Sequence, residues 1–357
     1  MGLHTRENNF DVLRIVSMVS VVFLHVSCQF IVPVADNARQ HVLEEVLFFN
    51  VFSRMAVPCF IMLSGAFLLC KETLDVRKLY SKTYRQLIKP TLFVSALCLA
   101  YVVLKSALLW HYDLLPMPFA EKMLTLLWNT VNGAPYYHLW YMYMLFGLYA
   151  ITPVLFMLKR QLSQRQAMAL AGLCLLAGLG QHHTGALFWM LDWAQYVGYF
   201  LCGALIREKA ASIGLPKGLF LAVSLLLLLL ALAVTYAYTL ALHTGERNVL
   251  FTFIPSLASH AYDFFIVPNA ELIVAASLCF FVFFAKLSVK KSYAQAAELT
   301  FFMYLVHAPI IDMLLTVQNM LAWRGLPILV SMLLLVVLTL VCSYYAAKGL
   351  KHFLATT

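Results

Sequence analysis

Long apolar segments separated by short polar loops make up almost the whole chain. Ten such segments are apparent, at about 11–31, 46–70, 88–110, 138–158, 167–182, 186–206, 218–242, 269–286, 297–317 and 327–347. About 20 apolar residues in a helix cross the hydrocarbon core of a bilayer, whereas a transmembrane barrel would alternate over strands of about ten residues. The pattern therefore predicts an all-α fold, a polytopic integral membrane helical bundle of about 10 transmembrane helices.

The composition agrees with a membrane protein. Of the 357 residues, 63% are hydrophobic and 11% are charged, and the mean hydropathy is +0.84. We see neither a soluble domain nor an internal repeat, so we expect one transmembrane domain over residues 1–357 with no fused soluble domain. The eight cysteines form no C-x-x-C pair and show no metal-ligand spacing, so no metal site is expected.

The basic residues are distributed unequally between the loops. Eighteen Lys and Arg residues lie in alternate loops and near the chain ends, whereas four lie in the opposite loops. Because Lys and Arg are enriched in cytoplasmic loops, we expect both termini to be cytoplasmic. This topology accounts for the net charge of +9 without a nucleic-acid partner.

Two ionisable residues interrupt the first apolar segment. Arg14 and His25 are eleven residues apart, which places them on nearly the same helix face and ~16 Å apart along the axis. Arg14, near the cytoplasmic end, is either a snorkelling anchor or a bidentate ligand for phosphate or carboxylate. His25 is too deep to snorkel, and it is either a general base or a buried histidine that bridges two helices.

The second segment carries a cation and helix-modifying residues. Arg54 lies about two turns below the outer surface, and Asn50 precedes it by one turn on the same face. Pro58 should kink the helix, and Ser64 with Gly65 provides a small-residue contact toward the inner end. Since a buried cation needs a partner, Arg54 is a candidate functional residue.

The densest basic patch is the segment DVRKLYSKTYRQLIKP at 75–90. If it is helical, Lys78, Lys82, Arg85 and Lys89 line one side at steps of three and four residues. Anionic lipid headgroups and a multiply phosphorylated cofactor are both possible ligands.

A late segment, ELTFFMYLVHAPIID, contains further titratable groups. Tyr304 and His307 are three residues apart and share a helix face. Asp312 is five residues beyond His307 and about 140° away from that face, so we do not pair the two.

The outer loops are rich in histidine, acidic, proline and aromatic residues. They include HYDLLPMPFAEK, NGAPYYHLW, QHHTG and SLASHAYDFFIVPNAE, and His138, Trp140 and Tyr141 open the fourth segment. Aromatic and imidazole groups at this level either anchor the protein at the membrane interface or bind sugars.

The residues together resemble acyltransferase family 3. Arg14 and His25 are similar to its R-x(10)-H motif, and SRMAVPCFIMLSGAFLL is similar to its V-P-x-F-F-x-x-S-G segment. The basic segment ending in Lys89-Pro90, then YHLWYMY and MYLVHAP, follow in the order of the family.

The resemblance implies a bacterial inner-membrane enzyme that transfers an acyl group, commonly acetyl, from cytoplasmic acyl-CoA. The implied acceptor is a hydroxyl of a surface polysaccharide or lipid-linked glycan, reached directly or through a separate periplasmic partner. The inner basic pair of the family corresponds to Lys82 and Arg85. Where the family often has arginine, Lys82 keeps the charge but not the bidentate geometry.

These expectations combine into one mechanism. Lys78, Lys82 and Arg85, with Arg14 at the mouth, would hold the phosphates of acetyl-CoA, and His25 would take the proton from the acceptor hydroxyl. Arg54 or Tyr304 would stabilise the oxyanion, His307 would complete the catalytic set, and His138, Trp140 and Tyr141 would bind the acceptor. Direct transfer and a covalent acyl-histidine are both open, and the alternative function is a transporter or flippase for a glycan or lipid.

Overall fold

The computed structural model describes residues 7–36, 40–108, 119–131, 135–184, 189–210, 212, 214–244, 270–320 and 326–356. All regular structure in these ranges is helical, as the hydropathy pattern predicts. The helices are α1 (Asn8–Asp36), α2 (Gln40–Ser53), α3 (Ala56–Leu69), α4 (Val76–Thr83), the π-helical η1 (Tyr84–Ile88), α5 (Lys89–Leu108), α6 (Phe119–Val131), α7 (Trp140–Gln161), α8 (Gln164–Thr184), α9 (Trp189–Ala210), α10 (Lys217–Thr244), α12 (Glu271–Lys286), α13 (Ala294–Met320) and α14 (Ile328–Thr356).

Each of the ten predicted spans overlaps a helix, and seven helical segments are long and apolar enough to cross a membrane. The chain is therefore a multi-pass membrane protein. The remaining three predicted spans correspond to α8, α9 and α12; α12 has 16 residues and a length of ~24 Å, short of the ~30 Å hydrocarbon core. The count of ten spans and the cytoplasmic termini stay predictions.

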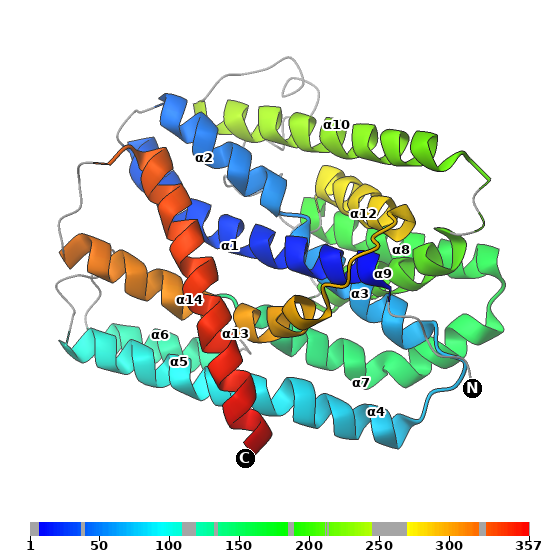
Figure 1. The fold of residues 1–357 in the computed structure, drawn as a ribbon, viewed down its shortest axis with the longest axis horizontal. Helices are drawn as coiled ribbons and strands as arrows, with labels where there is room; N and C mark the ends of the chain where they lie inside the picture. Colours follow the sequence, from blue (N-terminus) through cyan, green and yellow to red (C-terminus); the bar gives the residue numbers. More distant parts are fainter. Residues whose placement is uncertain are drawn as a thin grey trace. The chain divides into compact units, whose positions relative to one another are not determined.

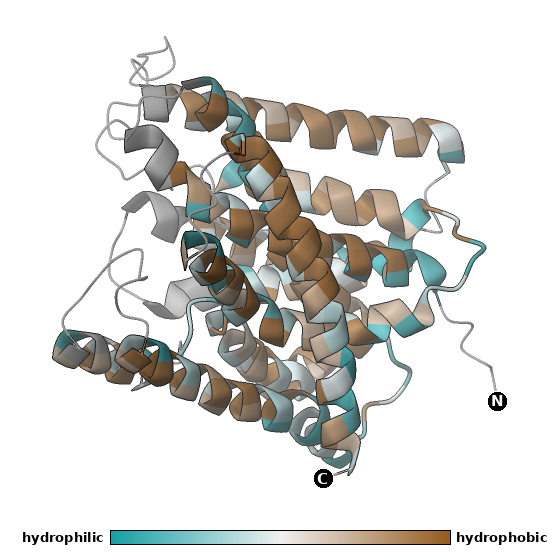
Figure 2. Cartoon of the chain, turned by 60° about the vertical axis from the view of Figure 1, so that its left-hand side comes forward, coloured by the Kyte–Doolittle hydropathy of each residue, from teal (hydrophilic) through white to brown (hydrophobic). Residues whose placement is uncertain are grey.

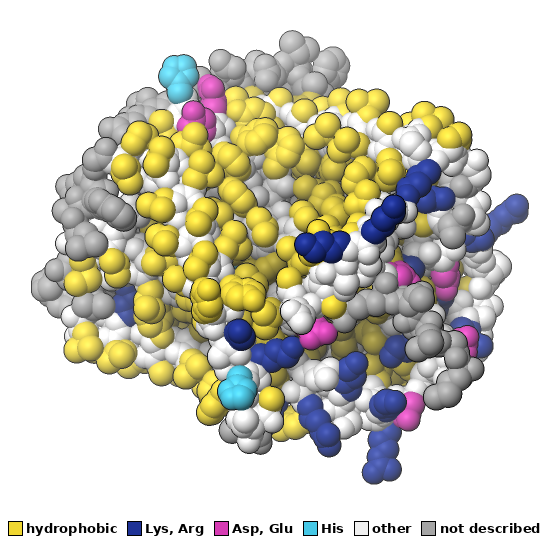
Figure 3. All heavy atoms as spheres, viewed as in Figure 1, with side chains coloured by type: hydrophobic (Ala, Val, Ile, Leu, Met, Phe, Trp, Pro, Cys, Tyr) yellow, Lys and Arg dark blue, Asp and Glu magenta, His cyan; other side chains and the backbone are white. Residues whose placement is uncertain are grey.

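Apolar residues cover the long helices. Figure 2 shows them along the length of the helices, with hydrophilic residues concentrated near helix ends. On the face shown in Figure 3, hydrophobic side chains form most of the surface. α10 illustrates this pattern, because several of its leucines, Leu226 and Leu230 among them, are exposed. Such a surface is suited to lipid rather than to water.

The second predicted span is broken in the middle. A turn at Arg54 and Met55 separates α2 from α3. Pro58 explains the position of the break, because proline has no N–H to donate to the carbonyl of Arg54 four residues earlier. The expected kink at Pro58 is therefore an interruption one turn before it, and Arg54 occupies that interruption.

The basic segment is helical and continues into the third span. The side chain of Asp75 caps α4 by accepting a hydrogen bond from the backbone N–H of Lys78 at 2.9 Å. In η1 the backbone N–H of Lys89 donates to the carbonyl of Tyr84, five residues earlier. A π turn contains one extra residue, so everything after it is rotated by roughly 100° relative to a continuous α-helix. Lys78, Lys82 and Arg85 are exposed, whereas Lys89 is half-buried on the far side of this turn.

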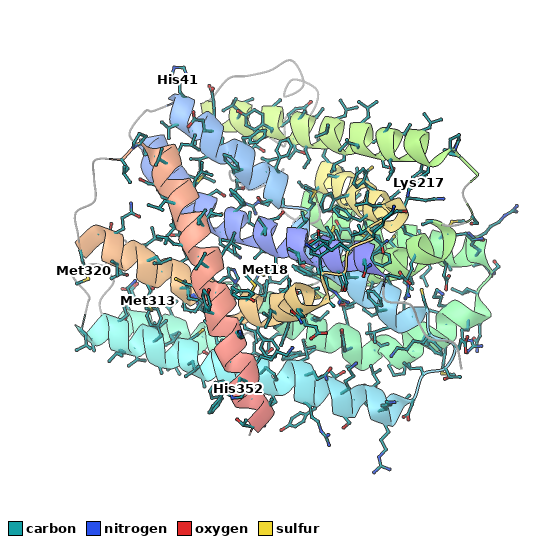
Figure 4. The ribbon with its side chains drawn as sticks, in the orientation of Figure 1. Met18, His41, Lys217, Met313, Met320 and His352 are labelled. Carbon is teal, nitrogen blue, oxygen red and sulfur yellow. The ribbon has the colours of Figure 1, made fainter. Side chains whose placement is uncertain are left out.

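The chain forms two compact units, residues 1–72 with 154–298 and residues 73–153 with 299–357. In the first unit, α1 packs on α2 and α3, α3 packs on α9, and α9 packs on α8. α10 contacts α12 and α2, and α2 lies between α1 and α10 (Figure 1). Figure 4 shows His41, near the start of α2, and Lys217, the first residue of α10, at opposite ends of this helix pair. The two helices run in opposite directions, as the predicted topology requires.

Glycines allow α3 and α9 to touch backbone to backbone. A Cβ atom on Gly65 would lie 1.8 Å from the carbonyl oxygen of Phe200, and one on Gly203 would lie 1.9 Å from that of Met62. Either distance is far inside van der Waals contact with backbone atoms. The small-residue contact expected at Ser64 and Gly65 therefore exists, and its partner is α9.

We expect Gly65→Ala and Gly203→Ala to lower the thermal stability of the purified protein, at a cost of about 1–3 kcal/mol each, because the new methyl group meets backbone that cannot move aside. The measurement is the midpoint of thermal unfolding in detergent, followed by tryptophan fluorescence. Gly172→Ala is the matched control, since nothing lies within 4 Å of its Cβ position and alanine favours the helix. Equal midpoints for all three variants would contradict the close crossing.

In the second unit, polar contacts join α5, α7 and α13. Lys105 Nζ lies 2.7 Å and 2.9 Å from the two carboxylate oxygens of Asp312, and the hydroxyl of Tyr101 donates to the same carboxylate at 2.7 Å. The hydroxyls of Ser95 and Tyr143 are 3.3 Å apart. An ion pair within a membrane segment satisfies both charges where water is scarce, so Asp312 has a structural partner that lies far away in the sequence.

Candidate functional site

Arg14 lies at the start of α1 among aromatic and acidic side chains of the first unit. Its Nη1 is 3.6 Å from Oδ1 of Asp11, which is buried, and its guanidinium lies 4.9 Å from the ring centroid of Phe67 on α3. The ring of Phe10 contacts Phe67 edge to face. About a third of the Arg14 side chain is exposed (32%), so an anion can reach its guanidinium while the aromatic ring holds it in place.

Arg207, on α9, shares the same ring. Its guanidinium lies 4.7 Å from the centroid of Phe67 and donates to the carbonyl of Ala66 at 2.7 Å. It also donates twice to Oε1 of Glu7, at 3.2 Å and 2.6 Å. From the sequence, Arg207 is one of the eighteen basic residues that predict the membrane topology, and its contacts with Phe67 and Glu7 were not predicted. The available signal was its spacing, since it follows Gly203 by one helical turn and so faces α3 where the two backbones touch.

His25 lies eleven residues along α1 from Arg14 and is half-buried. Met18, labelled in Figure 4, marks the part of α1 between them. Directly after His25, Asn50 of α2 donates to Ser27 Oγ at 3.0 Å and to Cys28 Sγ at 3.2 Å. The same amide accepts from Arg54 Nε at 3.0 Å and Nη2 at 2.9 Å, so the shared face predicted for Asn50 and Arg54 is confirmed.

The candidate cofactor-binding residues of the second unit form an accessible cationic face. Lys78, Lys82 and Arg85 are all exposed along α4 and η1. The exposed rings of Tyr80 and Tyr84 flank them, and the hydroxyl of Tyr80 donates to the carbonyl of Ala150 at 2.8 Å. Such a face can bind phosphate groups by charge and by hydrogen bonds.

Tyr304 and His307 meet His138 in the core of the second unit. The Tyr304 hydroxyl donates to the carbonyl of His138 at 2.6 Å, and His138 Nε2 is 3.1 Å from the carbonyl oxygen of Leu305. The rings of His138 and His307 have centroids 5.0 Å apart, and both side chains are fully buried. Their contacts are with the protein interior, which is the geometry of a bridge between α13 and the turn before α7.

The candidate acceptor-binding residues differ in exposure. Tyr141 is buried, with its ring 5.3 Å from that of Tyr304, and Trp140 is half-buried. Tyr136, in the preceding turn, lies near Asp312; burial first and then that carboxylate raise the pKa of the Tyr136 phenol well above its usual value. This phenol therefore stays protonated as a hydrogen-bond donor.

The predicted site residues are shared between the two units. Arg14, His25 and Arg54 belong to the first, and the remaining candidates belong to the second: Lys78, Lys82, Arg85, His138, Trp140, Tyr141, Tyr304 and His307. The outer segment SLASHAYDFFIVPNAE and the side chains of QHHTG lie outside the described residues, except Ala270 and Glu271. Among the described residues, no group of three or more His, Cys, Asp or Glu side chains could hold a metal ion.

Comparison with known proteins gives the family. The acyltransferase domain of acyltransferase family 3 matches residues 7–348, which include every candidate site residue. The chain belongs to this family. The resemblance to this family is thereby confirmed, and the family indicates an acyltransferase that uses an acyl donor.

One curated protein also resembles the chain. It is an amino-acid racemase of Enterococcus faecalis, 26% identical over 369 residues that cover 97% of this acyltransferase-family chain and 46% of the racemase. The chain thus spans about half the length of that relative. No solved structure matches this chain significantly.

Tyr304→Phe tests the hydrogen bond in the core of the second unit. The change leaves a buried carbonyl of His138 without its donor, which costs about 1–3 kcal/mol, so the thermal midpoint in detergent should fall. Tyr345→Phe is the control, because Tyr345 is exposed on α14 and the same loss of a hydroxyl should have no effect there. An unchanged midpoint for Tyr304→Phe would show that this hydroxyl does not stabilise the fold.

Proposed function

We propose that this protein is an O-acyltransferase of a bacterial plasma membrane. It transfers a short acyl group, acetyl in the simplest case, from cytoplasmic acyl-CoA to a hydroxyl of a surface polysaccharide or lipid-linked glycan. The observation that carries the proposal is the pairing of Arg14 and His25 on one helix of a family 3 acyltransferase domain. One residue can bind an anion at the helix start, and the other can move a proton deeper along the same helix.

The donor would be held first by its phosphates. Lys78, Lys82 and Arg85 are exposed and supply three positive charges on one helical face. In the first unit, Arg14 is a separate cation, and its guanidinium packs on the ring of Phe67. Acyl-CoA carries a diphosphate and a ribose phosphate, which match cationic groups of this kind.

The chemical step would take place at His25. Its neutral imidazole takes the proton of the acceptor hydroxyl, the oxygen attacks the thioester carbonyl, and CoA leaves as a thiol after taking up a proton. Negative charge develops on the carbonyl oxygen during the attack, and the Arg54 guanidinium is suited to stabilise it. Arg54 is a better candidate than Tyr304, because the hydroxyl of Tyr304 is engaged with the carbonyl of His138.

A transporter is the second candidate, and the break in the second span favours it. Discontinuous helices at the middle of a membrane often form the binding sites of transporters. The relative from Enterococcus faecalis is named for an amino acid, so an amino acid is a further possible acceptor or cargo. Release of free CoA thiol distinguishes transfer from transport, because a transporter consumes no acyl donor.

The test is turnover of radiolabelled acetyl-CoA by the purified protein in lipid with a co-purified or added glycan. We expect label on the glycan and free CoA thiol with the wild type. His25→Ala should lower turnover by about 10²–10⁴-fold, the contribution of general-base catalysis. Arg14→Ala should also lose activity, whereas both variants should insert and fold. A folded His25→Ala protein with full activity would refute the mechanism, and label on the protein itself would indicate the covalent route.

Lys82→Ala should raise the KM for acetyl-CoA about tenfold with little change in kcat, because loss of one solvent-exposed charge-assisted hydrogen bond to phosphate costs about 1.5 kcal/mol of binding. Lys89→Ala is the contrast, since Lys89 is half-buried beyond the π turn, whereas Lys78, Lys82 and Arg85 are exposed. Equal increases in KM for the two variants would show that the cationic face does not select the donor phosphates.

A further inference from the structure

Asn50 is a fully buried polar residue of α2 that connects α1 to the turn between α2 and α3. Its amide nitrogen donates to Ser27 Oγ at 3.0 Å and to Cys28 Sγ at 3.2 Å on α1. Its amide oxygen accepts from Arg54 Nε at 3.0 Å and Nη2 at 2.9 Å. All these groups lie within the apolar part of the chain, where each lost hydrogen bond is costly.

The orientation of the amide is determined by its neighbours. An arginine side chain can only donate hydrogen bonds, so the oxygen of Asn50 must face Arg54. The nitrogen then faces α1. The Ser27 hydroxyl donates to the carbonyl of Leu24 at 2.9 Å, which leaves its oxygen to accept from Asn50. No other orientation of the Asn50 amide satisfies both sides.

This contact lies directly beside the predicted base. Ser27 and Cys28 are two and three residues after His25, an axial rise of ~3–4.5 Å. Two residues before His25, the rings of Phe23 and Phe49 stack with centroids 5.3 Å apart and an interplanar angle of 11°. α1 and α2 are therefore fixed to each other on both sides of His25.

Arg54 needs this support because of its place in the chain. It lies in the turn between α2 and α3, where Pro58 removes the backbone hydrogen bond that would otherwise continue the helix. The two hydrogen bonds from Nε and Nη2 to one amide oxygen orient the guanidinium from the last turn of α2.

We propose that Asn50 is a positioning residue for the transfer reaction: it holds the Arg54 guanidinium in register with the His25 segment of α1. This inference rests on the proposed function. Asn50 does not touch the reacting atoms; it acts through Arg54. An amide orients the guanidinium without adding a negative charge beside it, whereas a carboxylate at this position would reduce the positive potential that the oxyanion requires.

The distinguishing variant is Asn50→Asp, which has nearly the same shape. A carboxylate still accepts both hydrogen bonds from Arg54, and the Ser27 hydroxyl can turn from the carbonyl of Leu24 to donate to the second carboxylate oxygen, so the protein should fold and the KM for acetyl-CoA should stay within about twofold. We expect kcat to fall by about 10–10³-fold, the range for weakening one oxyanion partner. The Asn50→Ala variant should lose the hydrogen bonds to Arg54 and to α1, and its kcat should fall at least as far. A purely structural role predicts instead that Asn50→Asp retains the wild-type kcat per folded molecule.

Two further measurements complete the experiment. Ser53→Ala is the control, because the hydroxyl of Ser53 donates only to the carbonyl of Phe49 in its own helix and the variant should match the wild type. In an Arg54→Gln background, which lacks the cation, Asn50→Asp should cause little additional loss of kcat if Asn50 acts through Arg54. Full additivity of the two losses, or a wild-type kcat in Asn50→Asp, would overturn the inference. Absence of acetyl-CoA turnover in the wild type would instead refute the proposed function on which this inference rests.

Discussion

The backbone contact between α3 and α9 determines how the first unit is built. Lipid provides no hydrophobic drive for helix association, so close packing must supply the attraction, and Gly65 with Gly203 removes the atoms that would keep the helices apart. The contact also places the side chain one helical turn after Gly203 on α9. Because the helices touch, Arg207 can donate to the carbonyl of Ala66 and lie on Phe67, the ring that also holds Arg14.

Many polar side chains of the membrane segments are satisfied by a partner on another helix or on their own backbone. Lys105 with Asp312 and Tyr304 with His138 illustrate the first case, and Ser53 with Phe49 illustrates the second. Where water is scarce, such pairs specify which helices meet. In both units some candidate site residues, Arg54 and Tyr304 among them, are therefore also structural residues.

Much of the architecture could be predicted from the sequence, because hydropathy and helical periodicity are local properties. The helical class, the presence of a helix within each predicted span, the shared face of Asn50 and Arg54 and the packing role of Gly65 all follow from local patterns. The basic segment was foreseen as a helix only conditionally. Its π turn was not foreseen, since no sequence rule marks one extra residue in a turn.

The remaining features depend on contacts between distant parts of the chain. Asp312 and Lys105 are 207 positions apart, and Arg207 and Glu7 are 200 apart, so spacing within one segment could not pair them. Pro58 predicted a kink in the second span. The helix is interrupted four residues earlier, because the carbonyl of Arg54 has no N–H of residue 58 to accept from. The buried state of His138 and His307 likewise depends on how α13 packs, and for His138 the sequence offered an anchor at the membrane interface as an equally good interpretation.

The π turn at Tyr84–Ile88 has a consequence for how this part of the molecule can change. α4, before it, carries Lys78 and Lys82, the π turn itself carries Arg85, and α5, after it, makes apolar contacts. The direction in which the cationic face of Lys78, Lys82 and Arg85 points around the helix axis, relative to α5, is therefore set by the one extra residue in the π turn. No particular side chain is needed to set it. A single-residue deletion or insertion there would re-aim Lys82 and Arg85 while every residue of α5 kept its neighbours, so the direction of this face can diverge between relatives independently of the helix that anchors it.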